Sequence, residues 1–486
     1  MLDNKLIIIN KNELSSNEFW QTVTKYSPNL SDWGVARLSE TLDKEIKTLV
    51  IEKKFICKDF RNLYSNYYSK KFKESSFYCD RLHFFSCDIK KEFELKINPE
   101  NYRNNYLGFS VIRPVPGRCI GRTVIDPYKI GKSFSNGYYC LRTEFRVNIC
   151  GANYLVSGFP YASQDTEVTV CAQTALWGVC RYFSERYSSY KEIYPFDLVL
   201  LTGNSNGRTF PYRGMSYSDY SKILSEFGVF PQIIKFDKNK KNIALEDKFK
   251  DVCAYVESGF PILASLGGHV VTLIGHTLNY ERKIQYDSDG FGHSSDLIDN
   301  FIVIDDNKQP YSLLPMKKCN LLSMKKNDSN LFIDSIQTAV CPLPEKVFLT
   351  AKKARLIACE SLLKLKKDLT IKEDGEKWIT RLYLTTCSAF KTFKLKAAVE
   401  NKDKLSYFVS NLDLPHFVWV MEVSTIDNYK NNTCVAEIIL DATSGIKDKG
   451  QLYLRFGKQF WVNDIGKKID TAPKTFDLFT HNLGGP

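Results

Sequence analysis

A cysteine at the start of a predicted helix is the first candidate for a catalytic residue in this chain. Cys171 lies in the stretch 169–180, whose apolar residues recur at three- and four-residue spacing, and Thr169 is suited to cap the helix. A thiol in the first helical turn meets the positive end of the helix dipole and free N–H groups, which favour thiolate. Cys171 is therefore our candidate nucleophile, and a small buried hydrophobe is the alternative role.

A thiolate in a hydrolase needs a base, and histidine titrates in the right range. His269 is one of only six histidines, and it opens the second of two apolar strands that a Gly-Gly turn joins within residues 259–275. We predict that it is the base. His276 falls on the opposite face of the same strand by alternation, and His293 is held in reserve because it lies in a loop.

An imidazole in such a site also needs a hydrogen-bond acceptor that fixes its tautomer and orientation. The apolar strand predicted at residues 301–307 ends in Asp305, Asp306 and Asn307, which all offer oxygen acceptors. The pattern predicts a third member of the site here and leaves its identity open among the three.

This order of residues resembles the papain-like cysteine peptidases, and most closely the bacterial peptidases that process double-glycine leader peptides. The resemblance spans roughly residues 160 to 312. Four motifs carry it: Cys171-Ala-Gln-Thr-Ala-Leu176, the Gly-x-Ser helix of residues 214–228, Gly259-Phe-Pro261, and His269 to Gly275.

The resemblance implies a papain-like core, in which the catalytic helix packs on an antiparallel sheet, with Cys171 and His269 in their catalytic roles. It selects Asp306 as the third member, with Asp305 next. The family carries an oxyanion-hole glutamine six residues before the cysteine, but this chain has Asp165 there. Gln164 is then the expected donor, with an ordinary loop glutamine as the alternative. Gln173 is expected to be structural.

The implied reaction is cleavage of a peptide or isopeptide bond in a protein or peptide substrate, after small residues such as Gly-Gly. The chain itself ends in Gly484-Gly485-Pro486, but cleavage of a Gly-Gly-containing partner is favoured over self-processing. Acyl transfer (transamidation) by the same residues remains an alternative, as does a catalytically inert protein-binding module.

Composition sets the remaining expectations for this 486-residue chain. It lacks an apolar stretch of about 20 residues and a signal-peptide core, and its 14 cysteines form no Cys-x-x-Cys pair. We expect a cytoplasmic protein with free thiols, no cofactor, no metal and no membrane partner. The net charge of +12 comes from scattered lysines, so we expect no nucleic-acid partner. Composition leaves the oligomeric state open.

The predicted fold is α+β in three parts. Residues 1–150 read as mostly helical to about residue 95 and then as β-rich, with strands predicted at residues 106–112 and 122–125. Residues 151–345 read as the peptidase domain, and residues 346–486 as an α/β domain. The Gly- and Pro-rich segment 113–123 carries three arginines that could cradle an anion, although a plain turn is the favoured interpretation. In the third part, Glu422, Glu437 and Asp441 lie on apolar strands and are expected to be solvated at an edge.

Overall fold

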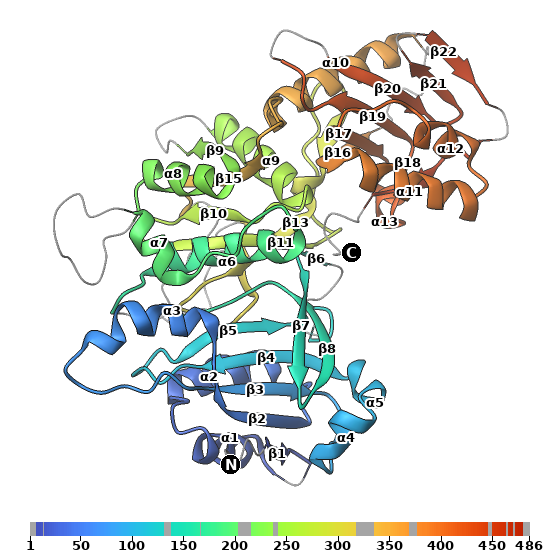
Figure 1. The fold of residues 1–486 in the computed structure, drawn as a ribbon. Helices are drawn as coiled ribbons and strands as arrows, with labels where there is room; N and C mark the ends of the chain where they lie inside the picture. Colours follow the sequence, from blue (N-terminus) through green and yellow to red (C-terminus); the bar gives the residue numbers. More distant parts are fainter. Residues whose placement is uncertain are drawn as a thin grey trace.

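The computed structural model shows a mixed α+β protein with several antiparallel sheets (Figure 1). It describes residues 6–12, 14–130, 138–165, 167–202, 215–236, 242–316, 335–368, 377–445, 450–462, 465–469 and 472–479. The last residues of the chain, including Gly484, Gly485 and Pro486, lie outside this description. None of the described helices is long and apolar enough to cross a membrane.

The N-terminal part is built on a five-stranded antiparallel sheet whose strands follow sequence order. Its strands are β1 (Leu6–Asn10), β2 (Thr48–Phe55), β3 (Cys79–Phe85), β4 (Tyr106–Ile112) and β5 (Ile120–Ile125). Its helices are α1 (Ser16–Tyr26), α2 (Asp32–Leu42), α3 (Lys58–Asn66), α4 (Glu92–Ile97) and α5 (Glu100–Arg103), with a 3-10 turn at Tyr68–Lys70.

The prediction that the first 95 residues are mostly helical is therefore wrong, because three of the five strands lie there. Strand β3 is buried along its whole length, and the first four residues of β2 are buried as well. Strands buried on both faces lose the alternation of apolar and polar residues that identifies a strand in sequence. The strands predicted at residues 106–112 and 122–125 are confirmed as β4 and β5.

The central sheet has the order β14-β13-β11-β10-β15-β9, and β6 also pairs with β11. The strands are β6 (Tyr138–Cys140), β9 (Val229–Lys235), β10 (Ile262–Ser265), β11 (Val270–Leu278), β13 (Ile298–Ile304), β14 (Ser312–Pro315) and β15 (Thr338–Pro344). The predicted hairpin of β10 and β11 is confirmed. Gly267 and Gly268 join its strands with φ of 76° and 104°, a region that favours glycine.

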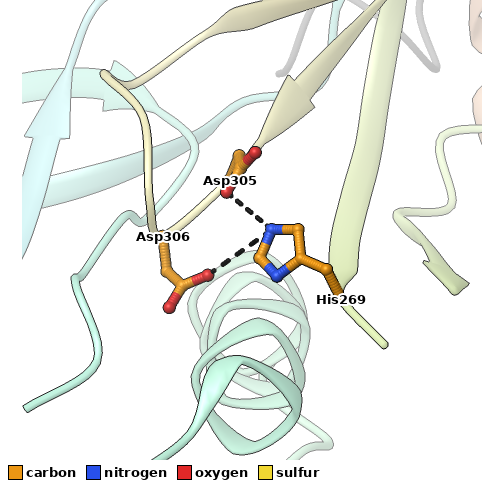
Figure 2. A group of neighbouring side chains, drawn as sticks. All are labelled: His269, Asp305 and Asp306. Carbon is orange, nitrogen blue, oxygen red and sulfur yellow. Dashed lines mark hydrogen bonds and ion pairs between the residues drawn. The ribbon is translucent and has the colours of Figure 1, made fainter. Parts of the chain in front are cut away.

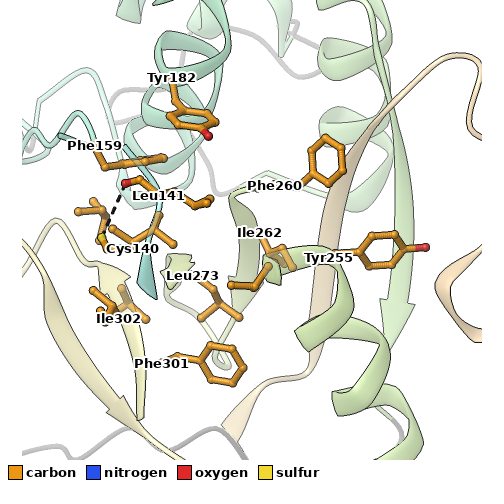
Figure 3. Close-up of a cluster of buried hydrophobic side chains, with 14 of the residues drawn as sticks. Cys140, Leu141, Phe159, Tyr182, Tyr255, Phe260, Ile262, Leu273, Phe301 and Ile302 are labelled. Carbon is orange, nitrogen blue, oxygen red and sulfur yellow. Dashed lines mark hydrogen bonds between the residues drawn. The ribbon is translucent and has the colours of Figure 1, made fainter. Parts of the chain in front are cut away.

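Helix α6 (Cys171–Arg186) packs on this sheet, with α7 (Pro195–Leu201), α8 (Tyr217–Phe227) and α9 (Asn242–Glu257) around it (Figure 1). The buried side chains between α6 and the sheet include Tyr182, which stacks on Phe159, and Leu273 of β11 (Figure 3). A hairpin of β7 (Thr143–Ile149) and β8 (Ala152–Gly158) links this layer to the N-terminal sheet. The start of α6 is thus held between two sheets.

The C-terminal part contains a second seven-stranded sheet, in the order β12-β16-β17-β19-β20-β21-β22. Its strands are β12 (Phe291–His293), β16 (Trp378–Thr386), β17 (Phe417–Ser424), β19 (Ala436–Asp441), β20 (Gln451–Phe456), β21 (Gln459–Val462) and β22 (Ile465–Lys468). The other elements are α10 (Ala351–Asp368), α11 (Cys387–Glu400), α12 (Lys404–Ser410), α13 (Ile426–Lys430), and the pair β18 (Thr433–Cys434) and β23 (Phe476–Asp477).

The expectation that the acidic residues of this sheet are solvated at an edge is wrong for two of the three. Glu422 and Glu437 lie on the interior strands β17 and β19 and are 1% and 0% exposed. Glu437 forms an ion pair with Lys394 of α11 at 2.5 Å. Buried carboxylates require such partners, which the local sequence does not reveal.

A buried charge network joins the C-terminal sheet to the central one. Arg381 of β16 donates to Glu257 at the end of α9 at 2.6 Å and to Glu422 at 2.8 Å. The other oxygen of Glu257 lies 2.5 Å from Nε2 of His276 on β11. Every member is nearly or fully buried, so each depends on the others for compensation of its charge.

We therefore expect Arg381→Met to lower the free energy of unfolding by about 3–5 kcal/mol, because it leaves Glu257 and Glu422 buried without their cation. Urea unfolding of the purified chain measures the change. Lys396→Met on α11 is the matched control, since its 3.8 Å pair with Glu400 is exposed and is worth at most about 1 kcal/mol. Equal effects of the two substitutions would contradict the conclusion that this network stabilises the contact between the C-terminal and central sheets.

Candidate active site

Strand pairing and one helix start bring the predicted site residues together. Strands β11 and β13 are antiparallel with Thr272 opposite Ile304. His269, just before β11, consequently faces the residues that follow β13. Helix α6 begins at Cys171, and its packing against β11 places the thiol at this end of the strand pair.

The imidazole of His269 is the centre of the site. Its Nε2 lies 2.8 Å from Oδ1 of Asp305 and 3.9 Å from Oδ1 of Asp306 (Figure 2). Cys171 lies close enough to His269 to raise the pKa of the imidazole. The described structure thus brings together the predicted nucleophile, the predicted base and an acidic partner, from three separate segments of the chain.

These contacts change the proton affinity of the imidazole. Burial opposes the charged form, but the hydrogen bond to Asp305, the nearby Cys171 and the charges of both aspartates outweigh it, and the pKa of His269 rises to about 10. Burial also acts to raise the pKa of Asp305, but the hydrogen bond and charge of His269 prevail and lower it. At neutral pH the pair is an imidazolium–carboxylate ion pair.

The geometry favours Asp305 as the third member, not the predicted Asp306. The chain leaves β13 in a turn in which Lys308 N–H donates to the carbonyl of Asp305, and Asn307 N–H donates to Oδ1 of Asp305 at 3.0 Å. The same Oδ1 accepts from His269. A turn, rather than strand alternation, therefore decides which carboxylate faces the ring, and the sequence motif that pointed to Asp306 carries no information about this turn.

Asp306 is buried beside the site without a hydrogen bond to either carboxylate oxygen. It is 4% exposed and lines a small space between α6 and the sheet, together with Thr174, Val270 and Ile304. Burial chiefly, with a contribution from the charge of Asp305, raises the pKa of Asp306 to about 6 against the opposing charge of His269. Its position suits an electrostatic influence on His269 more than a direct contact.

Asn307 connects the site to the N-terminal part of the chain. Its Nδ2 lies 3.4 Å from the ring nitrogens of His269, and its Oδ1 accepts a hydrogen bond from Arg118. Arg118 in turn lies over the ring of Trp33 on α2, at 5.6 Å from its centroid. Sequence reasoning missed this arginine as a support of the site, because only the tertiary fold brings residues 33 and 118 to the loop after β13.

The residues before α6 explain the departure from the expected glutamine. Asp165 is 2% exposed, and its Oδ1 accepts from the N–H groups of Val168 and Thr169 at 2.8 Å, so it holds the loop in shape. Gln164 is half-buried and makes no hydrogen bond within the part of the chain that the structure describes. Gln173 is buried and accepts from Val170 N–H, which is the structural role expected of it.

The remaining histidine candidates lie elsewhere. His276 is buried in the charge network that joins the central sheet to the C-terminal sheet, and its position on the strand predicts that it faces away from the site. His293 lies on β12 and pairs its Nδ1 with Ser295, and burial lowers its pKa to about 3. Neither shares a described contact with Cys171.

His269, Asp305 and Asp306 are also the one group of described residues with donor atoms close enough to hold a metal ion. The 2.8 Å contact between Nε2 and Oδ1 does not suit this role, because two ligands of a tetrahedral zinc lie about 3.4 Å apart. A proton between the two atoms fits the distance. The arrangement is that of an acid–base pair.

Neither a family model, nor a curated protein, nor a solved structure matches this chain. The case for function consequently rests on the geometry of the site.

The raised pKa of Asp306 predicts that the free energy of unfolding depends on pH, because ionising this buried carboxyl destabilises the folded state. The unfolded carboxyl ionises near its ordinary pKa of 3.8, whereas the folded one ionises near 6, so the native state binds more protons between these values. Relative to Asp306→Asn, the wild type should lose stability as pH rises from 4 to 7, by on the order of 1–3 kcal/mol. Urea unfolding of both proteins at pH 4.5 and 7.5 measures this difference, and a wild type that gains relative stability with pH would contradict it.

Proposed function

We propose that this protein is a cysteine-dependent hydrolase that cleaves a peptide or isopeptide bond through an acyl-enzyme on Cys171. The observation that carries the proposal is the Cys171–His269–Asp305 arrangement, in which the thiol at a helix start lies close enough to raise the pKa of an imidazole whose Nε2 is held by a carboxylate at 2.8 Å. Three side chains from distant segments meet in the order of roles that nucleophilic catalysis requires.

Each ring nitrogen of His269 has its own task in this mechanism. Asp305 occupies Nε2, which leaves Nδ1 to exchange a proton with the sulfur. The thiolate of Cys171 attacks the carbonyl carbon, the C–N bond breaks, and the leaving amine takes the proton from Nδ1. Nδ1 then removes a proton from water, the hydroxide attacks the thioester, and the C–S bond breaks to release the acid.

The developing oxyanion needs donors near the sulfur. The backbone N–H of Cys171 lies at the free start of α6 and supplies one. We propose the amide of Gln164 as the second, because Asp165 offers only acceptors and is committed to its loop. Gln164 lies one residue earlier in the sequence than the glutamine of the family, and this shift does not prevent it from taking the same role.

The proposal includes the papain-like core suggested by the sequence motifs. Its support is that α6 packs on an antiparallel sheet that carries His269 and Asp305 on adjacent strands. The resemblance to leader peptidases makes a protein or peptide with small residues at the cleavage point the proposed substrate, and the cytoplasm the proposed compartment. Transamidation would use the same acyl-enzyme with an amine in place of water.

The first test is selective alkylation of the nucleophile. At pH 6.5, iodoacetamide should modify Cys171 about tenfold or more faster than Cys387, because His269 beside Cys171 has a raised pKa and stays charged at this pH. Cys387 is a matched control, since it also begins a helix and is likewise half-buried. Mass spectrometry of peptides after timed alkylation gives both rates.

His269→Ala should reduce the rate at Cys171 to that at Cys387. An unchanged rate in this variant would contradict the catalytic assignment and favour the inert binding module. Labelling by an electrophilic peptidyl probe, with Cys171→Ala as the blank, extends the test to substrate-like reagents.

The second test separates the two aspartates. Asp305→Asn should lower the second-order rate constant for probe labelling about tenfold or more, because a neutral amide does not stabilise the imidazolium. Asp306→Asn should change it less than about threefold, since Asp306 makes no hydrogen bond to the ring. A larger loss in Asp306→Asn than in Asp305→Asn would return the third role to Asp306.

A further inference from the structure

The Gly- and Pro-rich segment 113–123 places an arginine with unused donors beside the candidate site. Arg118 donates from Nη1 to Oδ1 of Asn307, the residue whose Nδ2 lies 3.4 Å from the ring nitrogens of His269. A guanidinium carries five N–H donors, and the others of Arg118 have no acceptor within the described part of the chain. Arg118 is half-buried, and these remaining donors reach solvent. They are free to bind a ligand.

The guanidinium of Arg118 is held in place before any ligand arrives. It lies over the ring of Trp33 at 5.6 Å from the centroid, while its Nη1 is fixed by Asn307. Arg37 lies over the same ring at 5.7 Å, but it pairs with Glu40 at 2.9 Å, so the charge left for a ligand is that of Arg118. A stacked and hydrogen-bonded guanidinium loses little conformational entropy on binding, which favours affinity for a carboxylate.

A second cation follows in the turn after β13. Lys308 lies close enough to Asp305 for its charge to contribute to the lowered pKa of that carboxyl. Its backbone carbonyl accepts from the hydroxyl of Tyr161 at 2.8 Å, which fixes the turn against the N-terminal part. Lys308 is half-buried, and neither it nor Arg118 forms an ion pair among the residues that the structure describes.

The aspartates of the site do not occupy these two cations. Asp305 is 3% exposed and forms its ion pair with His269. Asp306 is 4% exposed, and neither of its oxygens accepts a hydrogen bond from Arg118 or Lys308. The negative charges therefore lie inside the protein, whereas the two cations reach its surface. An approaching substrate meets positive charge on this side of the site.

We propose that Arg118 and Lys308 form a subsite for a carboxylate of the substrate. Because only the side chain of Asn307 separates Arg118 from the ring of His269, a carboxylate bound there lies within a few bonds of the scissile carbonyl. Arginine binds a carboxylate through two parallel N–H groups, and the lysine adds a second charge. An acidic side chain or a free terminal carboxylate close to the cleavage point is thereby preferred. The inference rests on the proposed function, since the subsite serves a reaction at Cys171.

The test compares three reagents that alkylate Cys171 and differ in charge. N-iodoacetylglycinamide is neutral, N-iodoacetylglycine carries a terminal carboxylate, and the α-amide of N-iodoacetylaspartic acid carries a side-chain carboxylate. Timed alkylation at neutral pH and mass spectrometry of the peptides give the three rate constants. The ratio of each anionic rate to the neutral rate removes any change in the reactivity of the thiol itself.

In Arg118→Gln, at least one of the two ratios should fall about fivefold or more, because an ionic contact with the reagent is lost. Lys308→Gln should lower the same ratio by a smaller factor. The ratio that falls shows whether the subsite prefers a terminal or a side-chain carboxylate. Arg103→Gln is the matched control, since it removes the same charge from the exposed surface of α5, and it should leave both ratios unchanged.

Unchanged ratios in Arg118→Gln would overturn the subsite. This includes the case in which all three rates fall equally, because a purely structural role of Arg118 through Asn307 has that result. Failure of the proposed function gives a different outcome in the wild type, in which the neutral reagent would modify Cys171 no faster than Cys387.

Discussion

The antiparallel pairing of β11 with β13 is the constraint on which the candidate site depends. It sets His269, just before one strand, beside the turn that follows the other, and so determines that an aspartate meets the imidazole. Helix α6 then needs only to pack on β11 for Cys171 to arrive at the same point. A shift of the pairing by two residues would preserve every buried face and separate His269 from Asp305.

Asp305 and Asp306 lie beside the same imidazole but affect it differently, because the surroundings of the two carboxylates differ. Asp305 is stabilised as an anion by the hydrogen bonds that it accepts from His269 and Asn307. Asp306 has no such donor and lies against apolar side chains, so burial governs its proton affinity. The first aspartate can orient the ring and balance its charge, while the second adds to the negative potential that holds the proton on His269.

The site is also supported from outside the central sheet. Arg118 of the N-terminal part reaches Asn307, and Asp59 of α3 pairs with both Arg122 and Arg181 behind the start of α6. On the opposite side, Arg381 and Glu257 connect the C-terminal sheet to the helix that leads into β10. The three parts of the chain therefore meet through buried ionic contacts, which demand accurate placement because an unmatched buried charge is costly.

The sequence by itself determined the local features of this protein. Apolar spacing predicted the helix at Cys171, and the Gly-Gly turn and flanking apolar runs predicted the hairpin at His269, because these depend on residues close in the chain. Tertiary structure alone decided the sheet in the first 95 residues, the burial of Glu422 and Glu437, and the choice of Asp305 over Asp306. Each of these depends on non-local pairing or on a turn held by distant contacts, for which a local pattern carries no signal.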